Sequence, residues 1–528
     1  MTRQAQTDQE DDRMTHFVDS FYDGAAAYPD RVFAIDPQGR EWTYAEIAVV
    51  ADRVATGIIE AGVAPGSRVA IFSPNHVYGL AVNYGIVRAG CAWVALNYRM
   101  GAAALRETLR DIPVDGVFTH TSLEAQLDGV ELGPVGAVML DGPGVSAPGL
   151  EDWLPQDVEV EFPSPAPEDA AAILLTSGTT GKPKGIVVPH RAFVAMLDDF
   201  EEIFDYSEPP RHLVVAPITH AAGIYAAALH RHGGTHILMD QADPGAILDA
   251  IERYRITTVF LPPTLVYMML AHPTVRERDY SSLRTLIYGA SPMSADKVRE
   301  AWEVFGPVMF QGYGQSEALM VASVLTVDDH AEAIADPALA HRLASAGRPG
   351  PSTTVGIMDE TGALLQAGEK GEIVVRGDIV MSGYLDQPEA TAEAQAFGWH
   401  HTGDIGYIDE DGFVFVVDRK KDMIITGGLN VFPGEIERVL LGHPGVRDAA
   451  VVGVPNPKWG EAVHAAVECK DGVDLTEADL IAYCRPLLGG VKTPKSVAFV
   501  ETLPRNATGK ILKREVRAPF WEGHSRDI

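Results

Sequence analysis

The chain has 528 residues, of which 46% are hydrophobic and 22% charged, and its formal net charge at pH 7 is −31. The length is too great for one hydrophobic core, so two or three domains of an ordinary soluble globular protein are expected. Cys91, Cys469 and Cys484 are too few and too scattered for a disulfide framework or a zinc site. The polar, acidic segment Met1 to Arg13 is unlike a signal peptide, and no apolar run reaches the roughly 18 residues of a membrane span. These features favour a cytoplasmic protein without a membrane span.

The acidic excess argues against general nucleic-acid binding, because most of the surface would repel a phosphate backbone. From Arg419 to the end, 16 Lys and Arg stand against 14 Asp and Glu, a net of +2, whereas the preceding residues have 26 against 59, a net of −33. A near-neutral, locally basic tail on an acidic body would help to attract an anionic ligand. Solvated surface charge without a role is an equally good interpretation for any one residue.

Helix and strand patterns alternate from Phe17 onward, which predicts a doubly wound parallel sheet. Strands are expected at residues 68–72, 92–96 and 114–119, and helices at residues 43–61 and 76–89. The first helix is predicted to begin with Thr43 as its N-cap and Glu46 in a capping box. A Pro- and Gly-rich acidic stretch, Gly142 to Pro167, reads as a connection into the next strand.

A second α/β alternation follows. Its strands are expected at residues 212–216, 236–239, 257–261, 285–288 and 308–310, and its helices at residues 244–254 and 294–305. Between Gly347 and Val417, short strands punctuated by glycine predict a small antiparallel barrel or sheet. After Asp418, mixed helices and strands predict a compact α+β domain of about 110 residues.

The stretch Leu174 to His190 has the properties of a phosphate-binding loop. The apolar run Ala170 to Leu175 suits a buried strand and stops abruptly at small and hydroxylated residues. Glycines let backbone N–H groups approach an anion closely, while hydroxyls and lysines add donors and positive charge. The residues concerned are Thr176, Ser177, Gly178, Thr179, Thr180, Gly181, Lys182, Lys184 and Gly185. Pro183 stands where a Walker loop has Ser or Thr, so this is not a Walker loop; the alternative is an ordinary Gly/Ser/Thr surface loop.

The string from Thr176 to Gly185 resembles the signature of the adenylate-forming (AMP-binding) superfamily, which includes acyl-CoA and aryl-CoA synthetases, peptide-synthetase adenylation domains and firefly luciferase. The resemblance covers about Phe17 to Arg514, with at least five motifs in the family's order. It implies an α/β fold with a large N-terminal domain, residues 1–420, of two doubly wound β/α subdomains plus a small β-barrel. It also implies a smaller, mobile α+β C-terminal domain, residues 421–528, that carries the catalytic lysine and lines the CoA tunnel. The cofactors and substrates implied are ATP, Mg²⁺, CoA and a carboxylic acid.

The segment Gln311 to Ala318 is the next match to the family. Tyr313 offers an aromatic face for a purine, and Glu317 beside Ser316 offers oxygen ligands for Mg²⁺, together with Thr176. Ser316 replaces the Thr that is usual in the family but keeps the hydroxyl. Residues assigned by the resemblance to the nucleotide and to the pocket wall are Gly289, Ala290, Gln311, Gly312 and Gly314. Taken alone, this segment is equally well read as a Gly-rich turn.

Two further matches place ribose and CoA contacts near the C-terminal fifth of the chain. The resemblance gives Asp404 and Arg419 the contacts to the ribose, for which a carboxylate suits a vicinal diol, and it puts the hinge between the domains at Lys421. Gly427 and Gly428 resemble the glycines of the pantetheine tunnel, where a side chain would block the thiol. Trp459 resembles a tryptophan that packs on pantetheine, and a plain packing role is about equally compatible with it. The alternative interpretation of Asp404 is an ordinary Asp in a turn between two strands.

Lys510 matches the lysine that bridges the acid's carboxylate and the α-phosphate, where one cation offsets the repulsion between two anions. A basic solvated tail is the alternative interpretation. His220 lies where acyl- and aryl-CoA ligases place an aromatic residue or His beside the carboxylate, and a His satisfied in a turn is the alternative. Because His220 cannot hold an α-ammonium as an Asp would, an α-amino acid is disfavoured as the substrate. The residues expected to face the acid are His220, Tyr225, Gly289 and Gly314.

The activity that we expect is that of an ATP-dependent carboxylic acid–CoA ligase with Lys510, Glu317, Thr176 and His220 as its catalytic residues. Tyr225, Tyr288, Met293 and Met320 favour an aromatic, alicyclic or medium-chain acid, but the sequence does not identify it. One alternative is a free-standing adenylation enzyme that loads a carrier protein, and another is a nucleotide-binding sensor without catalysis. The expected partners are small molecules, and the sequence leaves open the oligomeric state, including a homodimer.

Overall fold

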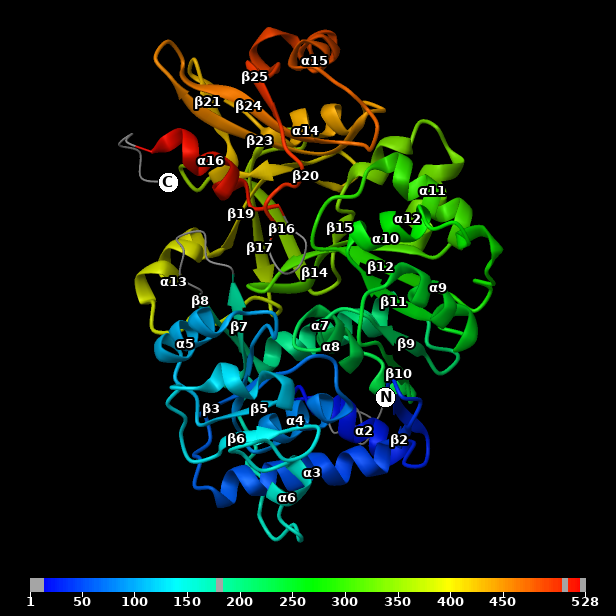
Figure 1. Cartoon of the computed structure of the whole chain (residues 1–528), viewed down its shortest axis with the longest axis vertical. Helices are drawn as coiled ribbons and strands as arrows, with labels where there is room; N and C mark the ends of the chain where they lie inside the picture. Colours follow the sequence, from blue (N-terminus) through cyan, green and yellow to red (C-terminus); the bar gives the residue numbers. More distant parts are fainter. Residues whose placement is uncertain (1–13, 177–183, 506–510, 523–528) are drawn as a thin grey trace, which may run out of the picture. The chain divides into compact units, whose positions relative to one another are not determined.

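The computed structural model of the chain, shown in Figure 1, describes residues 14–176, 184–505 and 511–522. Contacts divide the chain into two compact units: Met1–Thr354 with Val375–His400, and Val355–Val374 with His401–Ile528. The loop residues 177–183 and the predicted catalytic Lys510 lie outside the described residues.

The first unit contains a seven-stranded sheet with the order β18-β8-β7-β4-β3-β5-β6. Its strands are β3 (Arg68–Phe72), β4 (Ala92–Ala95), β5 (Gly116–Thr119), β6 (Gly136–Met139), β7 (Ala170–Thr176), β8 (Lys184–Pro189) and β18 (Gly383–Tyr384). The five strands from β7 to β6 run parallel, and β8 and β18 are antiparallel to their neighbours. The carboxyl ends of the parallel strands therefore share one edge, and β7 ends there at Thr176.

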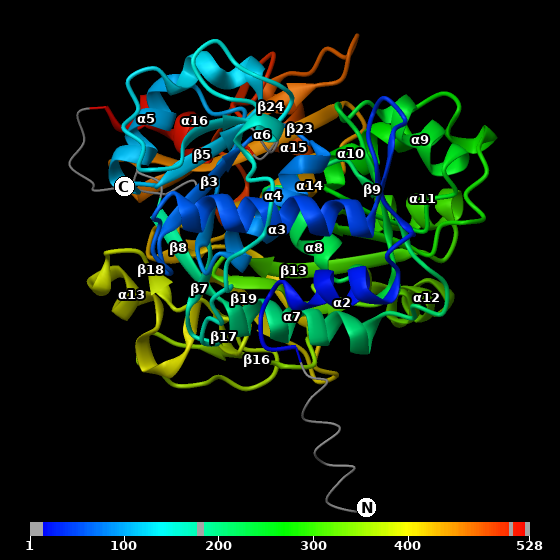
Figure 2. The same ribbon diagram turned by 90° about the horizontal axis from the view of Figure 1, so that it is seen from below.

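Helices α3 (Tyr44–Glu60) and α4 (Val77–Arg88) pack against each other beside this sheet, and Figure 2 shows α3 as the long helix across the unit. The predicted capping box is confirmed: Glu46 N donates to Thr43 Oγ1 at 3.2 Å, and Thr43 N donates to Glu46 Oε2 at 2.7 Å. Further helices of this part are α5 (Ala102–Asp111), α6 (Leu150–Trp153) and α13 (Pro388–Ala394).

A nine-stranded sheet has the order β15-β14-β13-β12-β11-β9-β10-β1-β2, and its central strands, from β13 to β1, are parallel. The strands are β1 (Val32–Ile35), β2 (Glu41–Thr43), β9 (Arg211–Val214), β10 (Thr235–Leu238), β11 (Thr258–Leu261), β12 (Thr285–Gly289), β13 (Met309–Gln315), β14 (Ala318–Leu325) and β15 (Arg348–Pro349). The helices around it are α2 (Asp19–Ala27), α7 (His190–Ile203), α8 (Ala221–Ala227), α9 (Pro244–Arg253), α10 (Pro263–Leu270), α11 (Ala295–Phe305) and α12 (Val327–Ala335). Alternation of helices and parallel strands in both sheets confirms the α/β fold class.

The structure corrects the prediction that a strand ends at Phe310. Strand β13 continues to Gln315 and returns as β14, with Gln311 paired to Leu325 and Tyr313 paired to Ser323. The glycine-rich sequence reads as a turn, but antiparallel backbone pairing with an apolar neighbour makes it a strand. The turn itself is only Ser316-Glu317.

Three histidines lie in the core of the first unit. His212, His230 and His236 are each 0% exposed, and they pack among the aromatic rings of Phe33 and Tyr84 and of Phe21, Tyr44 and Tyr225. His212 Nδ1 lies 3.2 Å from His236 Nδ1, and Tyr84 Oη lies 3.2 Å from His230 Nε2. Burial lowers the pKa of all three rings, that of His236 to about 3, so each ring is neutral at pH 7.

The second unit is built mainly from two sheets. The predicted small barrel or sheet is a four-stranded sheet with the order β16-β17-β19-β20; the ends of its first three strands extend into residues of the first unit. The other sheet has the order β22-β21-β24-β23, with β25 paired to β24. The strands are β16 (Thr353–Met358), β17 (Gly371–Gly377), β19 (His400–Ile408), β20 (Val414–Arg419), β21 (Ile424–Thr426), β22 (Leu429–Val431), β23 (Val446–Asn456), β24 (Gly460–Cys469) and β25 (Ser496–Phe499). The helices are α14 (Pro433–Leu441), α15 (Glu477–Lys492) and α16 (Lys513–Trp521).

The helices described between residues 14 and 522 include none that is long and apolar enough to cross a membrane.

Candidate functional site

The predicted phosphate loop joins the ends of a β-hairpin in the first unit. Thr176, the last residue of β7, pairs with Lys184, the first residue of β8, so residues 177–183 connect two strands that are held side by side. Ser177, Gly178, Thr179, Thr180 and Gly181 belong to this connection and lie outside the described residues. Strand β8 begins directly after this connection, where a Walker loop would run into a helix.

Lys184 and Glu317, which sequence reasoning assigned to one site, both contact Tyr384. The Nζ atom of Lys184 lies 4.6 Å from the centroid of the Tyr384 ring, within the range of a cation–π contact. Tyr384 Oη donates a hydrogen bond to Glu317 Oε1 at 3.1 Å, and Met381 N donates to the Glu317 carbonyl at 2.9 Å. Burial and the neighbouring carboxylate raise the pKa of Tyr384, so the phenol keeps its proton at neutral pH. Tyr384 thus connects the loop's exit to the turn that carries Glu317.

Sequence reasoning missed Tyr384. It stands in the short segment Ser382 to Leu385, where strand β18 pairs with β8. A two-residue edge strand gives no periodic signal, and only the pairing of β18 with β8 brings this ring to Lys184.

The predicted nucleotide and pocket residues of the first unit lie along two neighbouring strands. Gly289, at the end of β12, pairs with Gly312 on β13, and a Cβ at Gly289 would lie 2.6 Å from the Gly312 carbonyl oxygen. Ala290 follows with φ of +65°, an unusual conformation for a residue other than glycine. The remaining predicted residues of this group, Gln311, Tyr313, Gly314 and Ser316, lie on β13 or in the turn after it. The structure therefore brings these residues together at one sheet edge, as open α/β sheets require of a ligand site.

His220 and Tyr225, the two side chains expected to face the acid, have different environments. His220 is the N-cap residue of α8, its Nδ1 lies 2.9 Å from Thr219 Oγ1, and burial lowers the pKa of its ring. Tyr225 is 1% exposed, with its hydroxyl 2.8 Å from Thr258 Oγ1. The structure gives Tyr225 a position in the core, and its contact with the acid stays a prediction.

In the second unit, the two residues predicted to hold the ribose contact each other. Arg419 Nε lies 2.9 Å from Asp404 Oδ1, and Arg419 Nη1 donates to the Thr402 carbonyl at 3.3 Å. The contact follows from the pairing of Asp404 on β19 with Arg419 on β20. The Asp404 side chain is 5% exposed and that of Arg419 is 45% exposed, so the guanidinium is the more accessible member.

The residues predicted for CoA also lie together in this unit. Gly427 and Gly428 form the turn between β21 and β22 with φ of +59° and +79°, the left-handed conformations that a two-residue hairpin turn requires. A Cβ at either glycine would have no heavy atom within 4 Å, so the backbone conformation, rather than crowding within the protein, explains these glycines. Gly427 N donates to the Trp459 carbonyl at 2.8 Å, and Lys458 and Lys495 each place Nζ 5.4 Å from the Trp459 ring. Lys421, the predicted hinge, lies in the short 3₁₀ turn Lys420–Asp422.

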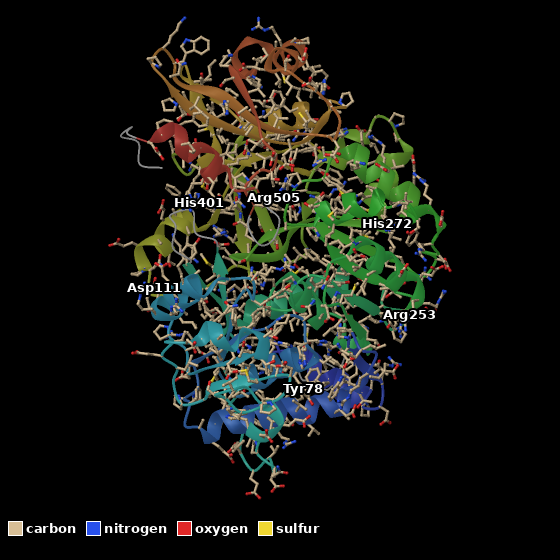
Figure 3. The ribbon with its side chains drawn as sticks, in the orientation of Figure 1. Tyr78, Asp111, Arg253, His272, His401 and Arg505 are labelled. Carbon is tan, nitrogen blue, oxygen red and sulfur yellow. The ribbon has the colours of Figure 1, made fainter. Side chains whose placement is uncertain are left out.

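Two groups of carboxylates paired with basic side chains include residues at the end of β20 or directly after it. Glu372 Oε2 lies 3.0 Å from His401 Nδ1 and 3.0 Å from Lys420 Nζ; His401 is labelled in Figure 3. A second group includes Asp418 on β20: Lys513 Nζ lies 2.9 Å from Glu437 Oε1 and 3.9 Å from Asp418 Oδ1. Sequence reasoning assigned no role to these residues, because isolated charged residues read as solvated surface.

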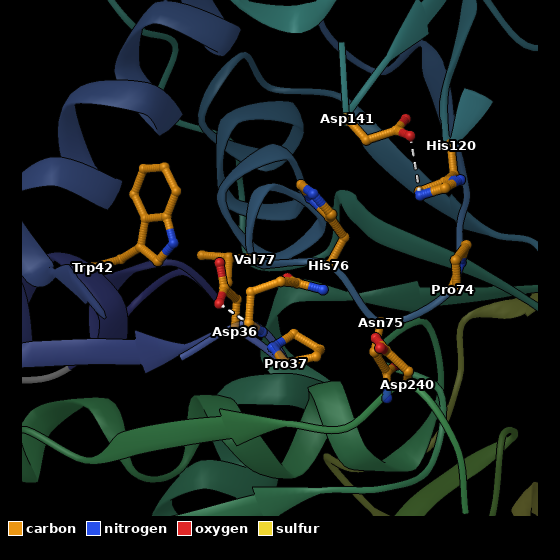
Figure 4. A pocket seen from close by; sticks show the side chains of 11 residues that line it. Asp36, Pro37, Trp42, Pro74, Asn75, His76, Val77, His120, Asp141 and Asp240 are labelled. Atoms are coloured by element: carbon orange, nitrogen blue, oxygen red, sulfur yellow. Dashed lines mark hydrogen bonds and ion pairs between the residues drawn. The ribbon is translucent and has the colours of Figure 1, made fainter. Parts of the chain in front are cut away.

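A separate cavity of about 220 Å³ in the first unit, shown in Figure 4, is lined by none of the predicted site residues. Two of its polar side chains, those of Asn75 and His120, have structural partners. Asn75 donates to three backbone carbonyl groups and accepts from Ile218 N, and His120 Nε2 lies 3.1 Å from Asp141 Oδ2. Among the described residues, no group of three or more His, Cys, Asp or Glu side chains could hold a metal ion, here or elsewhere. This cavity is therefore not a better candidate for the functional site than the predicted nucleotide site.

Comparison with known proteins agrees with this arrangement. The AMP-binding enzyme family matches residues 21–385, and the AMP-binding enzyme C-terminal domain matches residues 435–510. A feruloyl-CoA synthase of Amycolatopsis sp is 39% identical over 510 residues, covering 94% of this chain and 99% of its own. A fatty acid–[acyl-carrier-protein] ligase, ScoC of Streptomyces coeruleorubidus, is 33% identical over 499 residues, covering 93% and 94%. Among solved structures, the amide bond synthetase McbA from Marinactinospora thermotolerans superposes with a TM-score of 0.86 at 34% identity, covering 96% of this chain and 100% of that one.

Proposed function

Because the chain belongs to the family of AMP-binding enzymes, we propose that it is an ATP-dependent carboxylic acid–CoA ligase. It joins acid and ATP into an acyl-adenylate with release of pyrophosphate, and then transfers the acyl group to CoA with release of AMP. The observation that supports the proposal is the chain of contacts from Lys184 through Tyr384 to Glu317, which joins a cation at the start of β8 to a carboxylate in the turn after β13.

In the first step the loop holds the phosphates of ATP. Lys184, Thr176 and the backbone and hydroxyl groups of residues 177–181 would supply positive charge and donors. Glu317, with Thr176, would hold Mg²⁺, which offsets the negative charge of the phosphates when bound. The donor set fits this ion, because Mg²⁺ is usually bound through one or two carboxylates plus the phosphates of the substrate. The hydrogen bond from Tyr384 fixes the orientation of the Glu317 carboxylate.

Lys510 lies between the acid's carboxylate and the α-phosphate in this proposal, where its ammonium offsets the charge that grows in the transition state. Asp404 accepts hydrogen bonds from the ribose hydroxyls, and the contact of Arg419 with Asp404 orients that carboxylate. Residues 1–420 and 421–528 act as two domains that turn about Lys421 between the steps. Gly427, Gly428 and Trp459 then form the path of the CoA thiol.

The acid proposed is aromatic, alicyclic or medium-chain. Neutral His220 has no charge with which to hold an α-ammonium group, which disfavours amino acids. The feruloyl-CoA synthase that is 39% identical to this chain supports the aromatic class. We further propose that the enzyme acts in the cytoplasm. Its oligomeric state is either a monomer or a homodimer, and sedimentation would distinguish the two.

The acceptor is the second point to test, since the relatives include a ligase for an acyl carrier protein and an amide bond synthetase. Pyrophosphate release is measured across a panel of carboxylic acids, and the best acid is then offered CoA, a phosphopantetheinylated carrier protein or a primary amine. The proposal predicts fastest product formation with CoA. Faster transfer to the carrier protein would favour the carrier-loading alternative, and no pyrophosphate release with any acid would favour a nucleotide sensor. Pyrophosphate release that survives unchanged in Lys510→Ala would remove the proposed first step.

A further inference from the structure

A lysine with two carboxylate partners lies in the second unit at the start of α16. Lys513 Nζ is 2.9 Å from Glu437 Oε1 on α14 and 3.9 Å from Asp418 Oδ1 on β20. The three side chains are 19%, 16% and 5% exposed, so the network is largely shielded from water. Facing carboxylates raise the pKa of Lys513 although burial alone would lower it, and the lysine is therefore charged at neutral pH.

These residues lie on both sides of the predicted hinge in the sequence. Asp418 precedes Lys421 by three residues, whereas Glu437 and Lys513 follow it. Asp418 Oδ2 also accepts a hydrogen bond from Gly434 N at the start of α14. Every contact from Asp418 to Gly434 and Lys513 therefore joins the chain before the hinge to the domain after it.

Glu437 has a second partner on its own side of the hinge. Its Oε1 accepts from Val451 N at 2.7 Å, which fixes the carboxylate to β23. If Asp418 moved away, Lys513 would keep Glu437 as its counter-ion, because both residues belong to the same moving body. Breaking the link to Asp418 would then cost far less than leaving a buried ammonium without a partner.

We propose that Asp418, Gly434 and Lys513 form a latch, a set of contacts across the hinge that holds the enzyme in one of its two half-reaction conformations. Glu437 remains the counter-ion of Lys513 when these contacts break. The inference rests on the proposed function, which requires a turn about Lys421. Rotation there separates Asp418 from Gly434 N and Lys513, while Lys513 and Glu437 move together. Lys513 is a positioning residue: it follows the predicted catalytic Lys510 by three residues and fixes the start of α16 against β20.

The test measures the two half-reactions separately in the full-length enzyme. Acid-dependent exchange of pyrophosphate into ATP reports adenylate formation, and single-turnover consumption of preformed acyl-adenylate on adding CoA reports the second step. The variants are Asp418→Asn, which removes the charge on the far side of the hinge and leaves Lys513 paired with Glu437, and Lys513→Met, which removes the latch from the other side. The matched control is Lys492→Met, which deletes a lysine 2.7 Å from Glu435 in the same unit without contact to Asp418.

Loss of a hydrogen bond to a charged group typically changes an equilibrium by roughly tenfold or more. Both latch variants are therefore expected to change the ratio of the two half-reaction rates by about tenfold or more in the same direction, and Lys492→Met by less than about twofold. A ratio that stays within twofold of wild type in Asp418→Asn, or equal losses in both steps, overturns the latch. If Lys513→Met does not fold, Asp418→Asn alone decides. Wild-type enzyme without pyrophosphate exchange would instead overturn the proposed function.

Discussion

The buried histidines of the first unit should make the protein sensitive to mild acid. His212, His230 and His236 are neutral in the folded chain because burial lowers the pKa of each ring, and in the unfolded chain each returns to a pKa of about 6.5. The unfolded state thus binds more protons below neutral pH. Stability from this cluster is fully present above pH 6.5 and is lost as the pH falls from there toward the folded-state values.

The difference in pKa between the folded and unfolded states gives the size of the effect, and the geometry gives a reason why the rings stay neutral. The 3.2 Å contact between His212 Nδ1 and His236 Nδ1 needs one donor and one acceptor, and protonation of the accepting ring would place two donors face to face. When the pH falls from 7.0 to 5.5, each ring that stays neutral in the folded chain lowers the free energy of unfolding by about 1.3 kcal/mol. The three rings together should therefore remove roughly 4 kcal/mol.

The perturbation is His236→Asn, which keeps a polar atom near the Nδ1 position of the ring but does not titrate. Urea unfolding followed by tryptophan fluorescence gives the free energy of unfolding at both pH values. We expect the difference between pH 7.0 and 5.5 to shrink by about one third, or 1.3 kcal/mol, relative to wild type. Phe33→Leu, in the same core, should lower stability equally at both pH values. The same pH dependence in wild type and His236→Asn would refute the neutral cluster.

Three other substitutions test particular contacts. Tyr384→Phe removes the 3.1 Å hydrogen bond to Glu317 and should slow pyrophosphate exchange about tenfold with little change in the unfolding midpoint; an unchanged rate would mean that Glu317 needs no orientation. Gly289→Ala brings a methyl group to 2.6 Å from a carbonyl oxygen and should lower stability by about 1–3 kcal/mol in urea unfolding, whereas equal stability would show that β12 and β13 separate easily. Thr43→Ala removes the capping box of α3 and should cost about 1 kcal/mol, with Thr43→Ser as the variant that keeps the cap.

Sequence patterns predicted the local structure of the first unit well, because its strands and helices carry their own signals. The run Arg68 to Phe72 is uniformly apolar after its first residue and forms β3 with the predicted bounds. Helix α3 begins where Thr43 and Glu46 predict it. Glycine and polar residues hid the strand from Gln311 to Gln315, since there the partner strand, rather than the residues themselves, determines the conformation.

The sequence by itself determined the α/β class, the family, and the spacing of loop, turn and tail residues with the chemistry for a nucleotide, because these depend on residue types in order along the chain. Only the tertiary structure decided which side chains meet. Tyr384 reaches Lys184 and Glu317 because an edge strand pairs with β8, and Lys513 meets Asp418 because α16 packs on β23 and brings its first residue near β20. Tyr384 is 67 positions from Glu317 and 200 from Lys184, and Lys513 is 95 positions from Asp418. The periodicity of a sequence reports only on neighbours within a few residues, so it could not predict these contacts.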